Sequence, residues 1–259
     1  MISAGEPVND TGKKRSAQRS LASCLPIAHT PLDMPQTPNL LNDDGSASMA
    51  TMLMMSHHAF RRDIARFMRA IAQAKAGDHS RDVALKDEWD KSYHLALHGH
   101  HTIEDTKMFP DLKAKHPDLA AAIDTLTDQH HHIDPLLDRG DAAFADLAHP
   151  ENAEAVLNEL KALLDEHLVF EEAQVTPWLR DAKEFPVPPD DAAATMYADG
   201  FAWSMQGIAP EVLEQVRKML PEILLAKLPD AQKAFEERSA KTWGSYEVGS
   251  AVTPIPERF

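Results

Sequence analysis

Two stretches of the sequence decide its fold, HHTIEDTKMFP (100–110) and EHLVFEEAQVTPWL (166–179). Each stretch places a glutamate four residues after a histidine, the spacing at which two side chains share one face of an α-helix. The two pairs are His100–Glu104 and His167–Glu171. Both pairs fall on the apolar face of their segment, where an ionised carboxylate is costly unless it is paired or bound to a metal ion. The two stretches therefore predict a helical core that contains a metal site.

The surrounding sequence, from 49 to 183, repeats its apolar residues at helical spacing and is interrupted three times. The interruptions are GDHS (77–80), KHPD (115–118) and LAHPEN (147–152). They leave four segments of roughly 27 to 35 residues, which is long for helices of globular proteins. Long helices joined by short connections pack antiparallel. We therefore predict an all-α fold, in which residues 48–184 form an up-down-up-down four-helix bundle.

The sequence on the two sides of this bundle differs in character. Residues 1–47 are rich in Pro, Ser, Asn and Asp without periodicity, and we expect a disordered leader there, or translation that begins instead at Met34 or Met49. Residues 185–259 are expected to form a helical extension that packs on the bundle, followed by a tail that ends in TPIPERF. The helices of this extension are expected at 191–206, 210–227 and 230–240, bounded by Pro210, Pro221 and Pro229.

The composition excludes several classes of protein. The formal net charge of -15 disfavours a nucleic-acid partner, because phosphate backbones are bound by basic surfaces. No apolar run approaches the roughly 20 residues of a membrane span, and the N-terminal region holds no apolar signal core, so we expect a cytoplasmic protein without a membrane partner. The single cysteine, Cys24, excludes disulfide frameworks and cysteine-ligated zinc or iron–sulfur sites.

Histidine is concentrated in the predicted bundle, which holds 13 of the 14 histidines of the chain. Each of the four segments places one histidine on its apolar stripe, and in the second segment this stripe includes Trp89, Tyr93 and Leu97. The four histidines are His57, His100, His130 and His167. Their distances from the nearest interruption are similar, so they reach one level in an antiparallel bundle. Several neighbours are expected to point away from the core, namely His58, His101, His131 and Glu172.

The type and number of these residues indicate which metal they bind. A lone histidine on an apolar face is most often a hydrogen-bonded core residue, and the run His130–His132 alone is compatible with a polar patch or chance metal capture. Four histidines that agree in face and height, with two glutamates, favour a built site. They exceed the needs of one tetrahedral zinc ion, and without thiolates copper(I) is disfavoured. Two ions bridged by Glu104 and Glu171 fit, with iron expected and manganese as the less favoured substitute.

These stretches resemble the hemerythrin-like HHE cation-binding domain, including its bacterial members. The resemblance covers about 50–180 and rests on HHAFRRDIARF (57–67), HHTIEDTKMFP, QHHHIDPLL (129–137) and EHLVFEEAQVTPWL. It implies a non-haem di-iron centre, bridged by an oxo or hydroxo species and two carboxylates, that binds O₂ or reacts with O₂, peroxide or nitric oxide. The ligands that it implies are His57, His100, Glu104, His130, His167 and Glu171.

The chain departs from the family pattern at one position. Oxygen-carrying hemerythrins have a second histidine one turn after the ligand of the third helix, where this chain has Asp134. Asp134 either binds the metal or leaves a coordination position for water. Both alternatives favour redox or peroxide chemistry over simple reversible carriage of O₂.

Three functions are consistent with these features. The first is a di-iron protein that senses, stores or detoxifies O₂, peroxide or nitric oxide, with enzymatic redox activity left open. The second is an iron- or oxygen-responsive regulatory module that contacts a partner through an apolar cluster of the C-terminal extension, although packing against the bundle is the favoured interpretation of that cluster. Its residues are Met196, Tyr197, Phe201, Trp203 and Met205. The third is an inactive bundle whose histidines bind stray divalent ions.

Overall fold

The computed structural model describes residues 39–244, and every regular element within that range is helical. These residues belong to one compact unit. Among the described helices, none combines the length and the apolar character needed to cross a bilayer. The leader through residue 38, the alternative start at Met34 and the tail TPIPERF lie outside the described residues.

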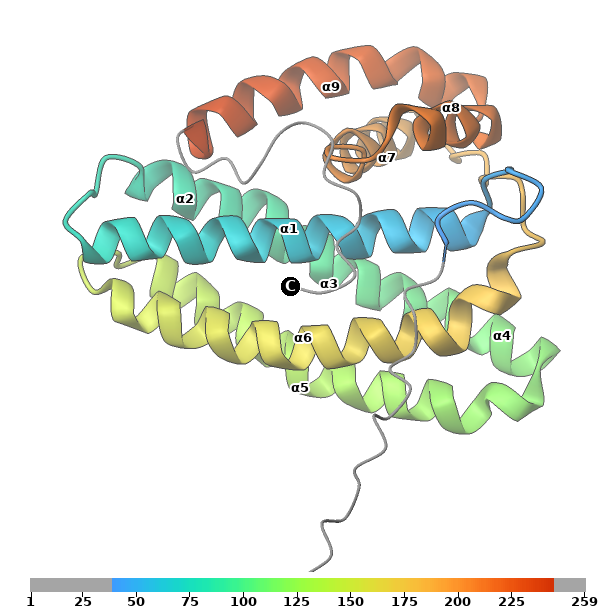
Figure 1. The fold of residues 1–259 in the computed structure, drawn as a ribbon, viewed down its shortest axis with the longest axis horizontal. Helices are drawn as coiled ribbons and strands as arrows, with labels where there is room; N and C mark the ends of the chain where they lie inside the picture. Colours follow the sequence, from blue (N-terminus) through green and yellow to red (C-terminus); the bar gives the residue numbers. More distant parts are fainter. Residues whose placement is uncertain (1–38, 245–259) are drawn as a thin grey trace, which may run out of the picture. The chain divides into compact units, whose positions relative to one another are not determined.

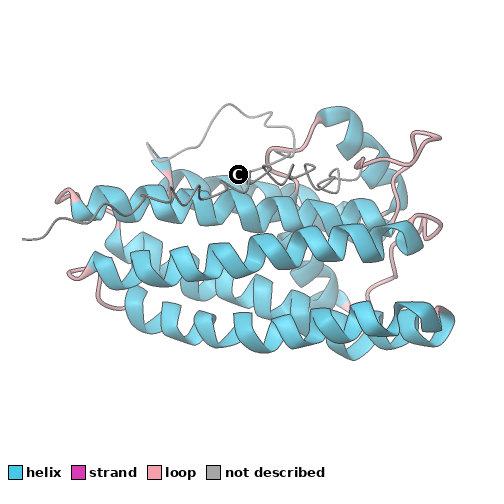
Figure 2. Ribbon diagram, turned by 60° about the horizontal axis from the view of Figure 1, so that its bottom comes forward, coloured by secondary structure: helices cyan, strands magenta, loops and turns pink. Residues whose placement is uncertain are grey.

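Four helical rods account for most of residues 49–179, and we number them 1 to 4 along the chain. Rod 1 is α1 (Met49–Lys75), and rod 4 is α6 (Pro150–Leu179). Rod 3 consists of the short turn η3 (Pro117–Leu119) and α5 (Ala120–Phe144). Rod 2 consists of five consecutive elements, α2 (Asp82–Glu88), η1 (Trp89–Tyr93), α3 (His94–Ile103), η2 (Glu104–Met108) and α4 (Phe109–Lys115). The rods lie side by side, and each runs against the one before it (Figures 1 and 2). Rod 4 packs against both rod 1 and rod 3. The three interruptions in the sequence fall at the turns between rods.

Local chemistry sets the ends of the rods. Gly77 follows rod 1 with a φ of 97°, in the left-handed region that glycine enters without steric cost. Pro150 occupies the first turn of rod 4, where its missing N–H has no intrahelical role. These signals are read from sequence alone, which is why the positions of the turns are predictable.

Rod 2 contains two π-helical turns, η1 and η2, which the sequence does not reveal. A π turn closes its hydrogen bonds at i+5 instead of i+4, so it holds one extra residue. A face counted at 100° per residue is therefore displaced by one position across each π turn. The apolar stripe counted from Trp89 to His100 crosses η1, and this displacement changes which histidines of α3 face the core.

The core between rods 2 and 3 is tightly packed at Trp89 and Gly140. Trp89 is fully buried and stacks on Phe144, with ring centroids 4.6 Å apart. A Cβ atom at Gly140 would lie 1.9 Å from Trp89 Cζ2, so only glycine permits this approach of α5 to η1. This contact holds the α3–η1 part of rod 2 against rod 3.

Replacing Gly140 with alanine is expected to lower the free energy of unfolding by about 1–3 kcal/mol, because the methyl group overlaps the rigid indole of Trp89. Urea unfolding followed by circular dichroism measures this loss. Gly200→Ala is the matched control, since Gly200 lies in a helix with nothing within 4 Å of its Cβ position. We expect the control to be neutral or stabilised by up to about 1 kcal/mol. Equal stability of the two variants would show that the Trp89 contact does not limit packing.

Three further helices follow the rods, namely α7 (Asp191–Ser204), α8 (Pro210–Met219) and α9 (Glu222–Thr242). Asp190 caps α7 by accepting a hydrogen bond of 2.8 Å from the Ala193 amide. The boundary predicted at Pro229 is wrong. The helix predicted at 210–227 ends already at Met219. Pro229 lies inside α9, because a single proline removes one intrahelical hydrogen bond without ending a well-packed helix.

Most of the apolar cluster of the extension packs inward, although Met196 is 59% exposed. Phe201, Trp203 and Met205 are buried, and Phe201 and Met205 share a core with Met52 and Met55 of α1. This agrees with the favoured interpretation of the cluster as packing. Figure 1 shows α7 lying beside α1.

The segment just before rod 1 also packs on the rods. Arg180 donates to the carbonyl of Asn39, and the side-chain amide of Asn42 donates to the carbonyl of Arg180 over 2.9 Å. Thr51 in α1 donates to the carbonyl of Leu40 over 2.6 Å, and Ala47 is buried. Residues 39–47, which the sequence places in the leader, therefore pack against the first turn of rod 1 and the residue that follows rod 4.

Candidate metal centre

The six predicted ligands lie in two adjacent groups. The ligand atoms of the first group lie within 4.8 Å of one another, and its members are His57 of α1, His100 of α3, Glu104 at the start of η2 and Glu171 of α6. The second group meets the same criterion and consists of His101 of α3, His130 of α5 and His167 of α6. All six predicted residues are thus placed together, and one further histidine joins them. We call these seven residues the central cluster.

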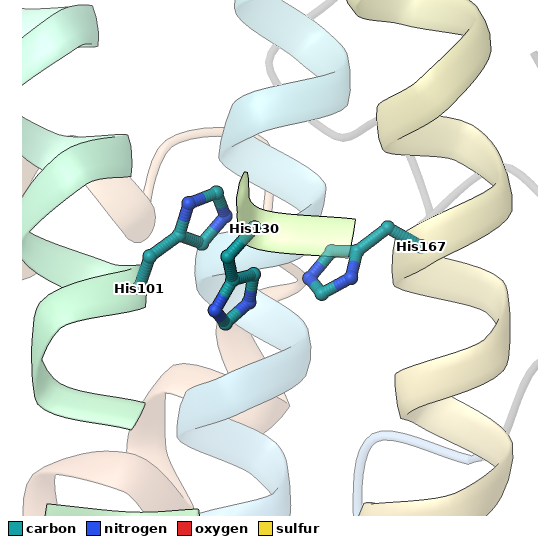
Figure 3. Close-up of side chains that lie close together, drawn as sticks. All are labelled: His101, His130 and His167. Carbon is teal, nitrogen blue, oxygen red and sulfur yellow. The ribbon is translucent and has the colours of Figure 1, made fainter. Parts of the chain in front are cut away.

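His101 is the residue that sequence reasoning missed. Its side chain is 1% exposed, and its ring stacks on His130 with centroids 3.9 Å apart. Figure 3 shows the rings of His101, His130 and His167 directed toward one another from three different helices. The expectation that His101 is exposed is wrong, because the π turn η1 lies between the apolar residues from which the face is counted and His101, and it displaces that face by one residue.

The two carboxylates lie between the two groups. Glu104 reaches His100 with one oxygen (Oε1 to Nε2, 2.8 Å) and His130 with the other (Oε2 to Nε2, 3.5 Å). Glu171 Oε2 lies 3.2 Å from His57 Nε2 and 3.7 Å from His167 Nε2. Each glutamate is therefore within reach of both groups, as a bridging ligand must be.

Carboxylates outside the cluster orient its histidines. Three of the Nδ1–H groups donate to carboxylates, which fixes the tautomer and turns the Nε2 atom into the cluster. The pairs are His57–Glu172 at 3.0 Å, His101–Asp134 at 2.6 Å and His130–Asp105 at 3.0 Å. In the same way His167 donates to Gln129 Oε1 over 3.0 Å. Such supporting bonds are typical of histidines that bind metals.

The predictions that Glu172 and His58 point away from the core are wrong. Glu172, expected to point outward, is 3% exposed and also pairs with Arg61 over 2.5 Å. Asp134 belongs to neither group of the cluster and instead holds His101 in place. His58, also expected outside, is buried as well, and burial with the nearby Arg62 charge lowers its pKa to about 4. His131 is exposed, as the sequence predicts.

The polar atoms of the central cluster show whether metal ions fit these residues. The Nε2 atoms of all five histidines and the four carboxylate oxygens are buried, and their only polar contacts within the described part of the chain are the ion-pair contacts with one another, none of which has hydrogen-bond geometry. Polar atoms buried in this way cost free energy unless something binds them. These nine nitrogen and oxygen atoms have lone pairs that can bind metal ions, and they lie in one place. A pair of metal ions would satisfy them. The residues therefore fit the implied metals.

Burial and neighbouring charges shift the pKa values of the cluster. Burial lowers the pKa of His167 to about 3 and that of His100 well below its usual range, so both imidazoles are neutral at pH 7. Burial and the charge of Glu171 raise the pKa of Glu104 well above its usual range. Burial also opposes ionisation of Glu171, but the adjacent His57 outweighs it and lowers the pKa of Glu171. Neutral imidazoles are the form that binds metal ions.

The comparison with protein families agrees with this geometry. Residues 48–180, which contain the whole central cluster, match the model of the hemerythrin HHE cation-binding domain. The chain belongs to this family. Cation binding is therefore the property that the HHE domain brings to this protein. Searches of curated proteins and of solved structures found no match.

Replacing Asp105 with asparagine is expected to weaken metal binding by the HHE domain about 10–100-fold, the usual effect of losing a carboxylate that supports a histidine ligand. Both oxygens of Asp105 lie 3.0 Å from His130 Nδ1, and the amide leaves that imidazole less firmly oriented. Competition with a chelator of known affinity measures the change. Asp128→Asn, at an exposed position of the helix that carries His130, is the control, and an equal effect of both variants would show that Asp105 does not support the site.

Proposed function

We propose that this protein is a hemerythrin-type, non-haem di-iron protein that binds or reacts with O₂, hydrogen peroxide or nitric oxide, built on an up-down-up-down four-helix bundle. The observation that carries the proposal is the set of nine buried, unsatisfied donor atoms of the central cluster. The family match supports cation binding, and the opposed directions of successive rods support the bundle topology.

The division of the ligands supports two metal ions of unequal surroundings. One ion would be held by His101, His130 and His167, the other by His57 and His100, and both would share the two glutamates. The first ion then has three protein nitrogens and the second only two, so the second keeps more positions for a small molecule. Mixed nitrogen and oxygen ligands without thiolates suit iron, with manganese as the less favoured alternative.

The chain's own residues provide the setting for that chemistry. Iron, when bound, supplies reversible one-electron changes and affinity for small oxygen and nitrogen species. Phe60 lies 5.2 Å from His100, and Phe109 stacks on His130 at 5.7 Å, so aromatic rings wall the cluster on two sides. These rings exclude bulk water, and Glu172, Asp105 and Asp134 keep the imidazoles turned inward. Asp134, held by His101, is not needed as a ligand.

Metal analysis with optical spectroscopy tests the proposal. Protein purified without oxygen and loaded with ferrous iron is expected to hold about two irons per chain, given two sets of ligands. Exposure to O₂, hydrogen peroxide and nitric oxide in separate samples is expected to change its visible spectrum, while the zinc-loaded protein gives no change. A single tightly bound ion per chain would overturn the proposal. So would visible spectra that do not change with O₂, hydrogen peroxide or nitric oxide.

A further inference from the structure

A groove runs between α3 and α5, on the outer side of the central cluster. It encloses about 400 Å³, and the residues that line it are His94, His98, His131, Asp134, Pro135 and Asp138. Three imidazoles and two carboxylates therefore meet on a surface that belongs to none of the ligand groups of the centre. We call it the α3–α5 groove.

One end of the groove brings together a further set of metal-binding groups. Ligand atoms of His94, Asp138 and Asp141 lie within 4.8 Å of one another. His94 Nδ1 lies 2.8 Å from Asp141 Oδ1, and the indole N–H of Trp89 donates to the same oxygen over 2.8 Å. The buried Trp89 ring thus fixes the position of the Asp141 carboxylate, which is preorganised for a ligand at the surface.

The charge of the groove favours a cation. It carries the carboxylates of Asp134 and Asp138, with Asp141 beside them, and no lysine or arginine lines it. Two basic residues lie near these carboxylates, and both are paired, Arg139 with Glu159 of α6 over 2.8 Å and Lys86, whose charge also acts on Asp141, with Asp90. Imidazole and carboxylate groups together are the ligands of divalent transition metals such as Fe²⁺, Mn²⁺ and Zn²⁺.

The groove is joined to the central cluster by one carboxylate. Asp134 Oδ2 lies 3.5 Å from His98 Nδ1 in the groove, and Asp134 Oδ1 accepts the hydrogen bond of 2.6 Å from His101. The side chain of His101 is 1% exposed, whereas that of Asp134 is 33% exposed. The aspartate–histidine pair Asp134–His101 therefore connects the surface of the groove with the buried cluster.

We propose that the α3–α5 groove captures a divalent transition metal ion, Fe²⁺ above all, with His94, Asp138 and Asp141 as ligands, and passes it by way of Asp134 to the buried centre. The capture site stands on the groove alone, and the passage rests on the proposed function. Because the ligands of the centre are buried, a loading site at the surface would raise the local metal concentration where the path begins.

A double variant, His94→Ala with Asp138→Asn, tests both steps. The matched control is His79→Ala with Asp82→Asn, which removes another histidine–aspartate pair, 3.0 Å apart, that lies outside the groove lining. Metal-free protein is titrated with Co²⁺ alone, and iron uptake is followed by mixing with Fe²⁺. We expect the groove variant to bind one Co²⁺ fewer per chain than the control and to load iron about tenfold more slowly or worse, with the final iron content unchanged.

The outcomes separate capture, passage and the proposed function. Equal Co²⁺ stoichiometry in the two variants overturns the capture site. A lost Co²⁺ ion with unchanged iron uptake overturns the passage and supports capture. Repeating the titration in a Glu104→Gln, Glu171→Gln background, which disables the centre, still shows the groove ion if capture holds, even if the di-iron assignment fails. Circular dichroism confirms that each variant is folded.

Discussion

Replacing His101 with alanine is expected to leave the protein with about one tightly bound metal ion per chain instead of two. His101 supplies one of the three imidazoles of its group, and its Nε2 atom is buried without a hydrogen-bond partner. Without it, only His130 and His167 remain as nitrogen ligands of that ion. Iron content after gel filtration measures the loss, and the visible spectrum reports the change in the pair of ions.

The control for this prediction is His132→Ala on α5. His132 is exposed and bonds the carbonyl of Asp128 in its own helix, so its loss should leave both ions in place. Partial recovery of the second ion when free imidazole is added to His101→Ala would show that the missing ligand, and not misfolding, causes the loss. If His101→Ala retains two ions as tightly as the parent protein, His101 is not a ligand and the ligand set is limited to the six residues predicted from the sequence.

Replacing Asp63 with alanine is expected to lower the free energy of unfolding by about 3–5 kcal/mol, the largest stability effect that we predict. Asp63 is 2% exposed and accepts bonds from Arg62 (2.8 Å) and Arg66 (3.0 Å). It also accepts a bond of 2.7 Å from the indole N–H of Trp203, which attaches α7 to α1. The substitution removes the carboxylate that neutralises two buried guanidinium groups. Urea unfolding of the metal-free protein measures the loss.

The surface pair Lys75–Glu154 provides the control for Asp63. Its side chains are more than 40% exposed, so Glu154→Ala should cost no more than about 1 kcal/mol.

The pH dependence of stability gives a second check on the role of Asp63. Burial raises the pKa of Asp63, but the charges of Arg62 and Arg66 outweigh it and lower that pKa below its usual value. The stabilisation is therefore complete above pH ~4 and is lost as the pH falls through the lowered pKa. A loss no greater than that of Glu154→Ala would contradict the prediction.

The sequence predicts the parts of this protein that depend on neighbours within one helix. The spacing of four residues between His100 and Glu104 places both side chains on one face wherever the helix lies. The same holds for His167 and Glu171, and the structure brings all four together. The turns at GDHS, KHPD and LAHPEN are local signals too, and they fall between the rods.

The sequence predicts poorly what depends on irregular turns or on distant residues. A regular helix counted through η1 predicts His101 on the polar side, but the π turn adds a residue there. One signal in the sequence could have suggested that His101 takes the place of the histidine that Asp134 replaces on α5. This signal is that His101 directly follows the predicted ligand His100. Glu172 supports a histidine 115 residues earlier in the chain, a relation that no local pattern contains.

By itself, then, the sequence determined that the chain is helical, where its rods turn, and which histidine–glutamate pairs share a face, because helical periodicity and turn chemistry act over a few residues. Only the tertiary structure decided that His101 lies with His130 and His167, that Asp134 accepts a hydrogen bond from His101 and lies outside both groups, and that a groove of histidines and aspartates opens beside it. These depend on how rods 2, 3 and 4 pack, and packing joins residues that lie far apart in the chain.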